Sequence, residues 1–285
     1  MLKIIPHAAA QSVSGSLVIA LHCSGGTGYQ WQKLRQALGP PFKVISPNLI
    51  GCGDNPHWNG KSRFKLTDEA RPIVESIDTW NGSVHLVGHS YGGTVALRVA
   101  VERPARIASL SLYEPTAFHV LKATGEDGKV ALKEISVLAA KIRRFVVAGA
   151  GWAAARCFVD YWNRPGTFEA LNPDAQADLV RYIPKAFLDF RAAIEERVPL
   201  VAYRRLRAPL RLMIGETAPL ATELPARKLS VVMNPGALRV VKGAGHMGPQ
   251  SHSDIVVKMI IDNIAASDPS AAWYRTPISP APQAA

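Results

Sequence analysis

The chain has 285 residues, of which 48% are hydrophobic and 19% charged, and its formal net charge is +11. This composition is typical of a soluble globular protein that buries a large core, either one α/β domain or one with an insertion. Three cysteines are too few for a disulfide framework and lack the spacing of a zinc site, and the scattered basic residues accompany no nucleic-acid-binding signature. The missing signature means that we expect no nucleic-acid partner. Because no stretch has the pattern of a signal peptide or a membrane span, we expect a cytoplasmic protein.

The first strong element is a β-branched apolar run over residues 16–22. It predicts a strand buried on both faces, as in a parallel sheet. The glycine-rich loop that follows, residues 23–28, does not end in the lysine and adjoining Ser/Thr of a phosphate-binding loop. We therefore expect it to donate backbone N–H groups to an oxyanion. Residues 3–5 are a candidate edge strand. The next predicted elements are a helix over 29–38, a strand over 43–46 and a helix over 67–80.

The sequence Gly88-His89-Ser90-Tyr91-Gly92 lies between an apolar strand and a helix that begins near Thr94. Strand, sharp turn and helix in this order are the setting of a Gly-x-Ser-x-Gly nucleophile elbow. Gly88 and Gly92 lack the Cβ atoms that would clash where strand and helix pass through the turn. We therefore predict that Ser90 lies at the tip in a strained conformation. Its hydroxyl then faces a helix N-terminus that stabilises an oxyanion.

A strand over residues 107–113 stops at Glu114, and the alternation of strands and helices then breaks over 116–207. That stretch is helical in pattern and rich in aromatic residues, so we interpret it as an inserted lid. Alternation resumes with strands over 210–215 and 238–242 and helices over 223–234 and 253–266. The predicted organisation is an α/β core of residues 1–115 and 208–266, a lid of residues 116–207, and a loose Pro/Ala-rich tail of residues 267–285.

Four features follow the ends of successive predicted strands: the loop after His22, then Ser90, Glu114 and His246. In open parallel sheets this edge is where ligands bind. With the motifs Leu21–Gly26, Gly51-Cys52-Gly53, Gly88–Gly92 and Gly245-His246-Met247, the chain resembles the α/β-hydrolase superfamily from about Leu17 to Ala266. The resemblance implies a mostly parallel, doubly wound central sheet flanked by helices, with an inserted lid. The chain order serine, acid, histidine also matches.

The resemblance implies a role for each of these residues. Ser90 attacks a carbonyl carbon while His246 takes its proton. The implied oxyanion hole consists of the backbone N–H groups of Ser24 and Tyr91. Two side chains are expected to contact the substrate, His22 and Trp162. Cys23 stands where the family usually has glycine, and a side chain at this position is expected to narrow the oxyanion hole.

The acid departs from the common pattern of the family. Many members carry an aspartate shortly after the strand equivalent to residues 210–215, where this chain has Ala218. Some members place the acid after the strand that precedes the lid, and Glu114 occupies that place. Both strand ends can reach the same histidine because the two strands are expected to be neighbours. We predict Glu114 as the acid and keep Glu216 as the alternative.

Together these residues predict a cofactor-free serine hydrolase that cleaves a carboxylic ester, thioester or lactone through an acyl-enzyme. The substrate is expected to be a small, fairly apolar molecule enclosed by the lid. His85 and His89 lie on a strand and a turn rather than on one helix face, so no metal site is expected. Two alternatives stay open: carbon–carbon bond hydrolysis of a diketone-type substrate, and a non-catalytic ligand-binding protein on the same fold. A homo-oligomer is also left open.

Overall fold

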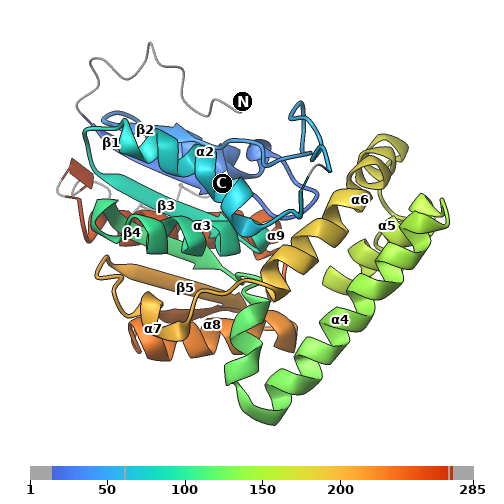
Figure 1. Ribbon diagram of the computed structural model, residues 1–285. Helices are drawn as coiled ribbons and strands as arrows, with labels where there is room; N and C mark the ends of the chain where they lie inside the picture. Colours follow the sequence, from blue (N-terminus) through green and yellow to red (C-terminus); the bar gives the residue numbers. More distant parts are fainter. Residues whose placement is uncertain (1–14, 61, 269, 272–285) are drawn as a thin grey trace, which may run out of the picture.

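The computed structural model describes residues 15–271 apart from residues 61 and 269. Within these ranges six strands form one sheet, in the order β2-β1-β3-β4-β5-β6, and every neighbouring pair is parallel (Figure 1). The strands are β1 (Ser16–Leu21), β2 (Phe42–Ile45), β3 (Val84–His89), β4 (Ile107–Tyr113), β5 (Leu210–Gly215) and β6 (Leu238–Val241). The expected edge strand at residues 3–5 lies outside the described residues.

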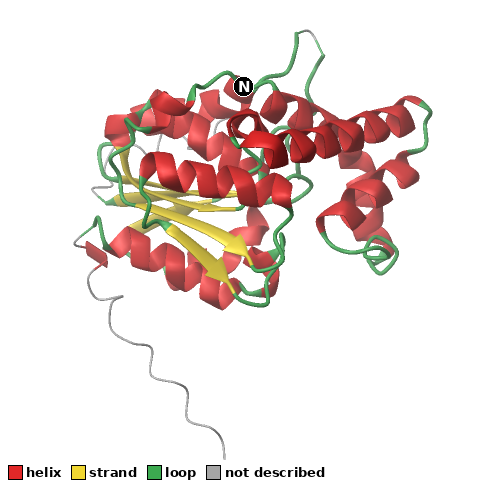
Figure 2. Cartoon of the chain, turned by 90° about the horizontal axis from the view of Figure 1, so that it is seen from below, coloured by secondary structure: helices red, strands yellow, loops and turns green. Residues whose placement is uncertain are grey.

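Helices cover both faces of the sheet, as Figure 2 shows from below. The apolar residues of β1 alternate between the two layers: Leu17 and Ile19 belong to one buried cluster, Val18 and Ala20 to the other. One face is covered by α1 (Gln32–Ala37) and α10 (Ser253–Ala265), the other by α2 (Leu66–Asp78), α3 (Tyr91–Glu102) and α8 (Leu220–Met233). Burial on both faces explains the continuously apolar strands. The predicted doubly wound α/β fold is confirmed.

Between β4 and β5 the chain leaves the sheet and forms a helical segment, residues 116–207, whose long helices over residues 125–194 extend to the right in Figure 1. Its elements are η4 (Phe118–Ala123), α4 (Gly125–Val147), α5 (Gly151–Trp162), α6 (Pro173–Ile194) and α7 (Leu200–Tyr203). Ring contacts hold it together, because Phe190 of α6 stacks on both Phe118 and Trp162. Helix α6 also contacts α2 and α3, which joins the helical segment to the core. No helix in the described ranges is both long and apolar enough to cross a bilayer.

Several short elements complete the chain: η2 (Gly28–Trp31), η3 (Pro104–Arg106) and α9 (Gly248–Ser251). The predicted helix over 29–38 therefore divides into a 3-10 turn and α1. The predicted loose tail needs a correction at its beginning. Asp268 is buried and accepts hydrogen bonds from Ser16 Oγ and His85 Nε2, the latter at 3.2 Å, so this part packs against β1 and β3. The rest of that prediction, residues 272–285, lies outside the described residues.

Candidate active site

Ser90 lies at the turn between β3 and α3, in the conformation that the motif predicts. Its φ of 55° and ψ of −121° are strained for a residue with a side chain. A Cβ at Gly88 would lie 2.6 Å from Gly92 O, and a Cβ at Gly92 would lie 2.4 Å from His22 O. Only glycine fits at these two positions, so the turn can be this tight and can present Ser90 at the carboxyl edge of the sheet.

Ser90, His246 and Glu114 form a continuous hydrogen-bonded chain. His246 Nε2 lies 3.0 Å from Ser90 Oγ, and His246 Nδ1 lies 2.7 Å from Glu114 Oε2. All three side chains are buried. Because an ionised carboxylate can only accept, Nδ1 carries the imidazole proton and Nε2 is left to accept the Ser90 hydroxyl. The arrangement is that of a nucleophile, its base and the acid that orients the base.

Glu114 follows β4 directly and has a positive φ of 40°, which turns its side chain toward the last strands. Burial raises the pKa of this carboxyl, but hydrogen bonds from His246, Gly215 N–H and the Thr222 hydroxyl outweigh that effect and hold it below its ordinary value. The other candidate acid, Glu216, is exposed and accepts from Gly243 N–H at 2.9 Å. Of the two candidates, Glu114 is therefore the one in contact with His246.

Two side chains that the sequence did not single out hold the His246 loop. His89 Nε2 donates to the backbone carbonyl of His246 at 2.8 Å, and Tyr113 OH donates to Gly245 O at 2.7 Å. Gln30 Nε2 donates to His89 Nδ1 at 3.1 Å, which fixes the tautomer of that ring. Burial holds the pKa of His89 well below its ordinary value, so the ring is neutral. In the sequence, the position of His89 inside the elbow motif was the one indication that it has a role at the site.

The two predicted oxyanion donors flank Ser90. Tyr91 is the first residue of α3, so its backbone N–H is one of the four that have no acceptor within the helix. Ser24 lies in the loop after β1 and lines both cavities that contain Ser90. Cys23, the residue in place of the usual glycine, is buried next to it, and burial raises the pKa of its thiol to about 12. The thiol is therefore neutral at physiological pH.

The expectation that His22 contacts the substrate is wrong. His22 is fully buried and both ring nitrogens have protein partners: Nδ1 donates to Cys23 O at 2.8 Å, and Nε2 accepts from Leu49 N–H at 3.0 Å. Burial lowers the pKa of His22 to about 4, so it is neutral at physiological pH. It lines neither of the two cavities at Ser90. It supports the loop that carries Ser24.

Trp162, the other predicted contact residue, does face the cavities. Its ring stacks on the His246 imidazole with centroids 4.3 Å apart. It lines both a cavity of about 340 Å³, which reaches Ser90 and His246, and a void of about 10 Å³ that Ser90 shares with Ser24 and Asp189. The void has room for about one water molecule. A larger surface groove of about 660 Å³ lies at Arg63 and Arg98, away from Ser90.

Comparisons with known proteins relate the chain to one family. Residues 18–259 match the model of the alpha/beta hydrolase family. A putative carbamate hydrolase RutD of Variovorax paradoxus is 36% identical over 100 residues, 34% of this chain and 37% of that protein. Lipase LipV of Mycobacterium tuberculosis is 31% identical over 99 residues, 34% of this chain and 36% of that protein. The matches thus span about a third of the length of these curated relatives.

Among solved structures, the fold is similar to MGS-M2, an alpha/beta hydrolase from a Medee basin deep-sea metagenome library. The TM-score is 0.74 at 12% sequence identity, and the match covers 89% of this chain and 90% of that one. At this level of identity the likeness concerns the fold alone.

Proposed function

Because this chain belongs to the alpha/beta hydrolase family, we propose that it is a serine hydrolase that cleaves a carboxylic ester, thioester or lactone through an acyl-enzyme on Ser90. The observation that carries the proposal is the chain from Ser90 Oγ through His246 to Glu114, at a strained turn that opens on a 340 Å³ cavity. Strained backbone at a cavity is typical of functional sites, because the surrounding structure must hold it in place.

In the first half of the reaction, Ser90 Oγ attacks the substrate carbonyl carbon while His246 Nε2 takes the hydroxyl proton. The carbonyl oxygen becomes an oxyanion that the backbone N–H groups of Tyr91 and Ser24 stabilise, helped by the N-terminus of α3. The intermediate collapses to the acyl-enzyme, and His246 gives its proton to the leaving oxygen or sulfur. Glu114 holds the imidazole in place and stabilises its positive charge while it carries the extra proton.

In the second half, a water molecule attacks the acyl carbon and His246 takes one of its protons. The carboxylic acid leaves and Ser90 regains its hydroxyl proton. We propose that the helical segment acts as a lid over this chemistry, because its helix α5 supplies Phe158, Val159 and Trp162 to the cavity. A cavity lined by such side chains favours a small, fairly apolar substrate.

The test is intact-mass analysis after incubation with a fluorophosphonate, run beside hydrolysis of p-nitrophenyl butyrate. We expect one adduct on the wild type, none on Ser90→Ala, and a loss of kcat by about 10⁴-fold or more in that variant. Adduct formation that persists in Ser90→Ala would overturn the nucleophile assignment. A folded wild type that forms no adduct would instead favour a ligand-binding protein on this fold. Turnover of a β-diketone without ester turnover would favour carbon–carbon bond hydrolysis.

A further inference from the structure

A second cluster of ionisable side chains, outside the proposed reaction, joins the helical segment to the core. Lys185 and Asp189 lie one turn apart on α6, and Glu69 lies on α2. Lys185 Nζ lies 2.8 Å from Glu69 Oε1 and also contacts Asp189 Oδ1. None of the three side chains is more than 4% exposed. One ammonium group is thus shared between two buried carboxylates.

The second oxygen of Asp189 reaches the proposed oxyanion hole. Ser24 Oγ donates to Asp189 Oδ2 at 2.8 Å, and the Tyr182 hydroxyl donates to the same oxygen. Ser24 is the residue whose backbone N–H is proposed to bind the oxyanion, and Gly25 after it has a positive φ of 74°. Within the loop, Gly26 N–H donates to Cys23 O at 3.0 Å. The hydrogen bond to Asp189 adds a contact between Ser24 itself and α6.

The second oxygen of Glu69 binds the loop after β2, which in turn contacts His22 at the end of β1. Ile50 N–H donates to Glu69 Oε2 at 3.1 Å, and the preceding Leu49 N–H donates to His22 Nε2. His22 is two residues before Ser24. With the backbone from Leu49 to Ile50 and from His22 to Ser24, these contacts form a closed ring that passes through Glu69, Lys185 and Asp189.

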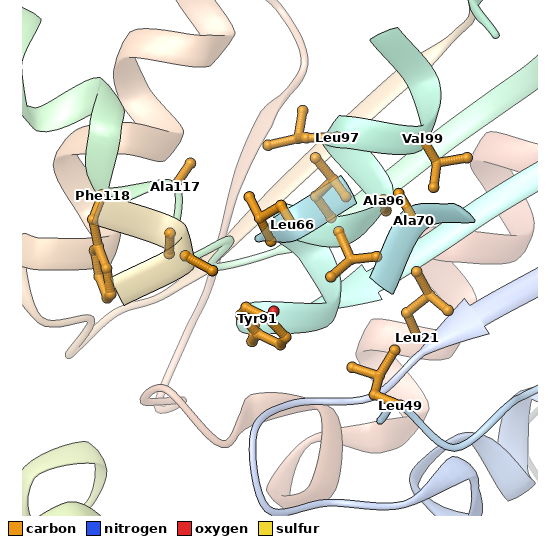
Figure 3. Close-up of a cluster of buried hydrophobic side chains, with 14 of the residues drawn as sticks. Leu21, Leu49, Leu66, Ala70, Tyr91, Ala96, Leu97, Val99, Ala117 and Phe118 are labelled. Carbon is orange, nitrogen blue, oxygen red and sulfur yellow. The ribbon is translucent and has the colours of Figure 1, made fainter. Parts of the chain in front are cut away.

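Lys185 also contacts the other proposed oxyanion residue. Its Nζ lies 5.0 Å from the centre of the Tyr91 ring and 4.6 Å from that of Phe64, both within cation–π range. Figure 3 shows the Tyr91 side chain within the buried cluster that includes Leu21, Leu49 and Leu66. Lys185 thus reaches Tyr91 directly and Ser24 through Asp189.

Lys185 stays charged at neutral pH, although its burial is unfavourable. Burial lowers the pKa of Lys185, but Asp189 and Glu69 raise it more, so the ammonium stays protonated. Burial raises the pKa of Glu69, and Lys185 partly offsets this. Ion pairs this deeply buried contribute little net stability compared with apolar residues of the same volume. Their more specific contribution here is the fixed geometry of the groups they bind.

We infer that Asp189, anchored by Lys185 and Glu69, is a positioning residue that fixes the Ser24 N–H of the oxyanion hole when the helical segment is docked on the core. This inference rests on the proposed function. It also makes docking a condition for the reaction. If α6 moves away from the core, Ser24 loses its hydrogen-bond partner and its N–H is no longer held in the direction of the oxyanion.

The first test is Ser24→Ala, which removes the hydroxyl but keeps the backbone N–H and is made at a partly buried residue. With p-nitrophenyl butyrate we expect kcat to fall by about 10- to 100-fold, the scale of a small misplacement of a catalytic group. KM should stay within about twofold, because the contact acts on the transition state and not on substrate binding. Affinity for a trifluoromethyl ketone should fall by the same factor as kcat/KM. Ser24→Thr, which keeps a hydroxyl, should recover most of the rate.

The second test is Asp189→Asn, alone and combined with Ser24→Ala. If Asp189 acts through Ser24, the double variant should be no slower than Asp189→Asn alone. The matched control is Glu195→Gln, which breaks another contact between the end of α6 and the core, the exposed ion pair with Arg63. This control should leave kcat unchanged, because Glu195 does not contact the loop after β1.

The two proposals fail in different ways. Unchanged kcat and unchanged trifluoromethyl ketone affinity in Ser24→Ala would overturn the positioning role, even if Ser90→Ala is inactive. A lower melting temperature with unchanged kcat would likewise reduce Asp189 to a structural contact. Full activity of Ser90→Ala would overturn the proposed function itself.

Discussion

Two buried clusters lie beside each other at the carboxyl edge of the sheet, and they are built in opposite ways. In the cluster of Ser90, His246 and Glu114, two members have positive φ angles and the group opens on a 340 Å³ cavity. In the cluster of Glu69, Lys185 and Asp189, all three residues lie on regular helices. The two clusters meet at the void that Ser90 shares with Asp189.

The difference shows how this fold separates reacting groups from supporting groups. Backbone strain costs about 1–3 kcal/mol per residue, and here it occurs where a side chain must project toward a substrate. The supporting cluster needs no strain, because helices place residues four apart on the same face. It needs full burial instead, since its contacts hold a loop only if water does not compete for them. We therefore expect damage to the first cluster to affect mainly the rate, and damage to the second to affect stability and, to a smaller extent, the rate.

The largest effect that would sharpen this contrast is expected from Glu114→Gln. The amide keeps the shape of the side chain but cannot stabilise the imidazolium, so kcat should fall by about 10⁴-fold. The measurement is steady-state hydrolysis of p-nitrophenyl butyrate. Glu216→Gln is the matched control and should be fully active, because Glu216 is exposed and contacts Gly243 rather than His246. A large loss in the control alone would mean that the acid is Glu216.

The next effect is expected from Lys185→Met, which leaves two buried carboxylates without their partner. The free energy of unfolding should fall by about 3–5 kcal/mol, as measured by urea denaturation. Lys258→Met is the control: Lys258 pairs with Asp262 at 2.8 Å on the surface, with side chains 67% and 41% exposed. Its loss should be below about 1 kcal/mol. An equal fall in the free energy of unfolding in the two variants would show that the buried cluster contributes no more to stability than a surface ion pair.

A smaller effect concerns His22, which belongs to the ring that passes through Glu69, Lys185 and Asp189. Its pKa is about 4 in the folded protein because of burial, against 6.5 in an unfolded chain. The unfolded state therefore binds the proton more readily, and stability is lost as pH falls from about 6.5 to about 4. By about pH 4, protonation of this residue in the unfolded chain lowers the free energy of unfolding by about 3 kcal/mol.

The measurement is urea denaturation of wild type and His22→Gln across that pH range. Wild type should lose more stability than the variant as the pH falls, because the variant has no imidazole to protonate. The other buried histidines, such as His119 with a pKa also lowered by burial to about 4, remain in both proteins and cancel in the comparison. Parallel pH profiles would contradict the buried, neutral state of His22.

These clusters also differ in how far the sequence predicts them. Ser90 and His246 lie in short glycine-containing motifs whose local geometry carries the chemistry, and Glu114 follows from the end of a strand. His22 was assigned wrongly because a residue at a strand end can point toward the ligand or into the core. Only the fold shows that both its ring nitrogens are already bonded.

The supporting cluster could not be predicted at all. Lys185 and Asp189 are spaced as an ordinary surface ion pair on a helix, and Glu69 is separated from Lys185 by 116 residues. Their burial depends on the docking of α6 against α2 and α3, which is a tertiary contact. Periodicity within one helix shows which residues share a face, but not which face meets another element.

The β3–α3–β4 unit has a consequence for the order of folding. It carries both Ser90 and Glu114, which are only 24 positions apart, whereas His246 lies 156 residues from Ser90. Closing the longer loop costs about 1.7 kcal/mol more in chain entropy. We therefore expect the nucleophile and the acid to come together in a local unit, and the base to join when the distant β6–α9 region docks. A refolding chain stays inactive until that last closure, so recovery of ester hydrolysis reports the arrival of the C-terminal strand and not the formation of the elbow.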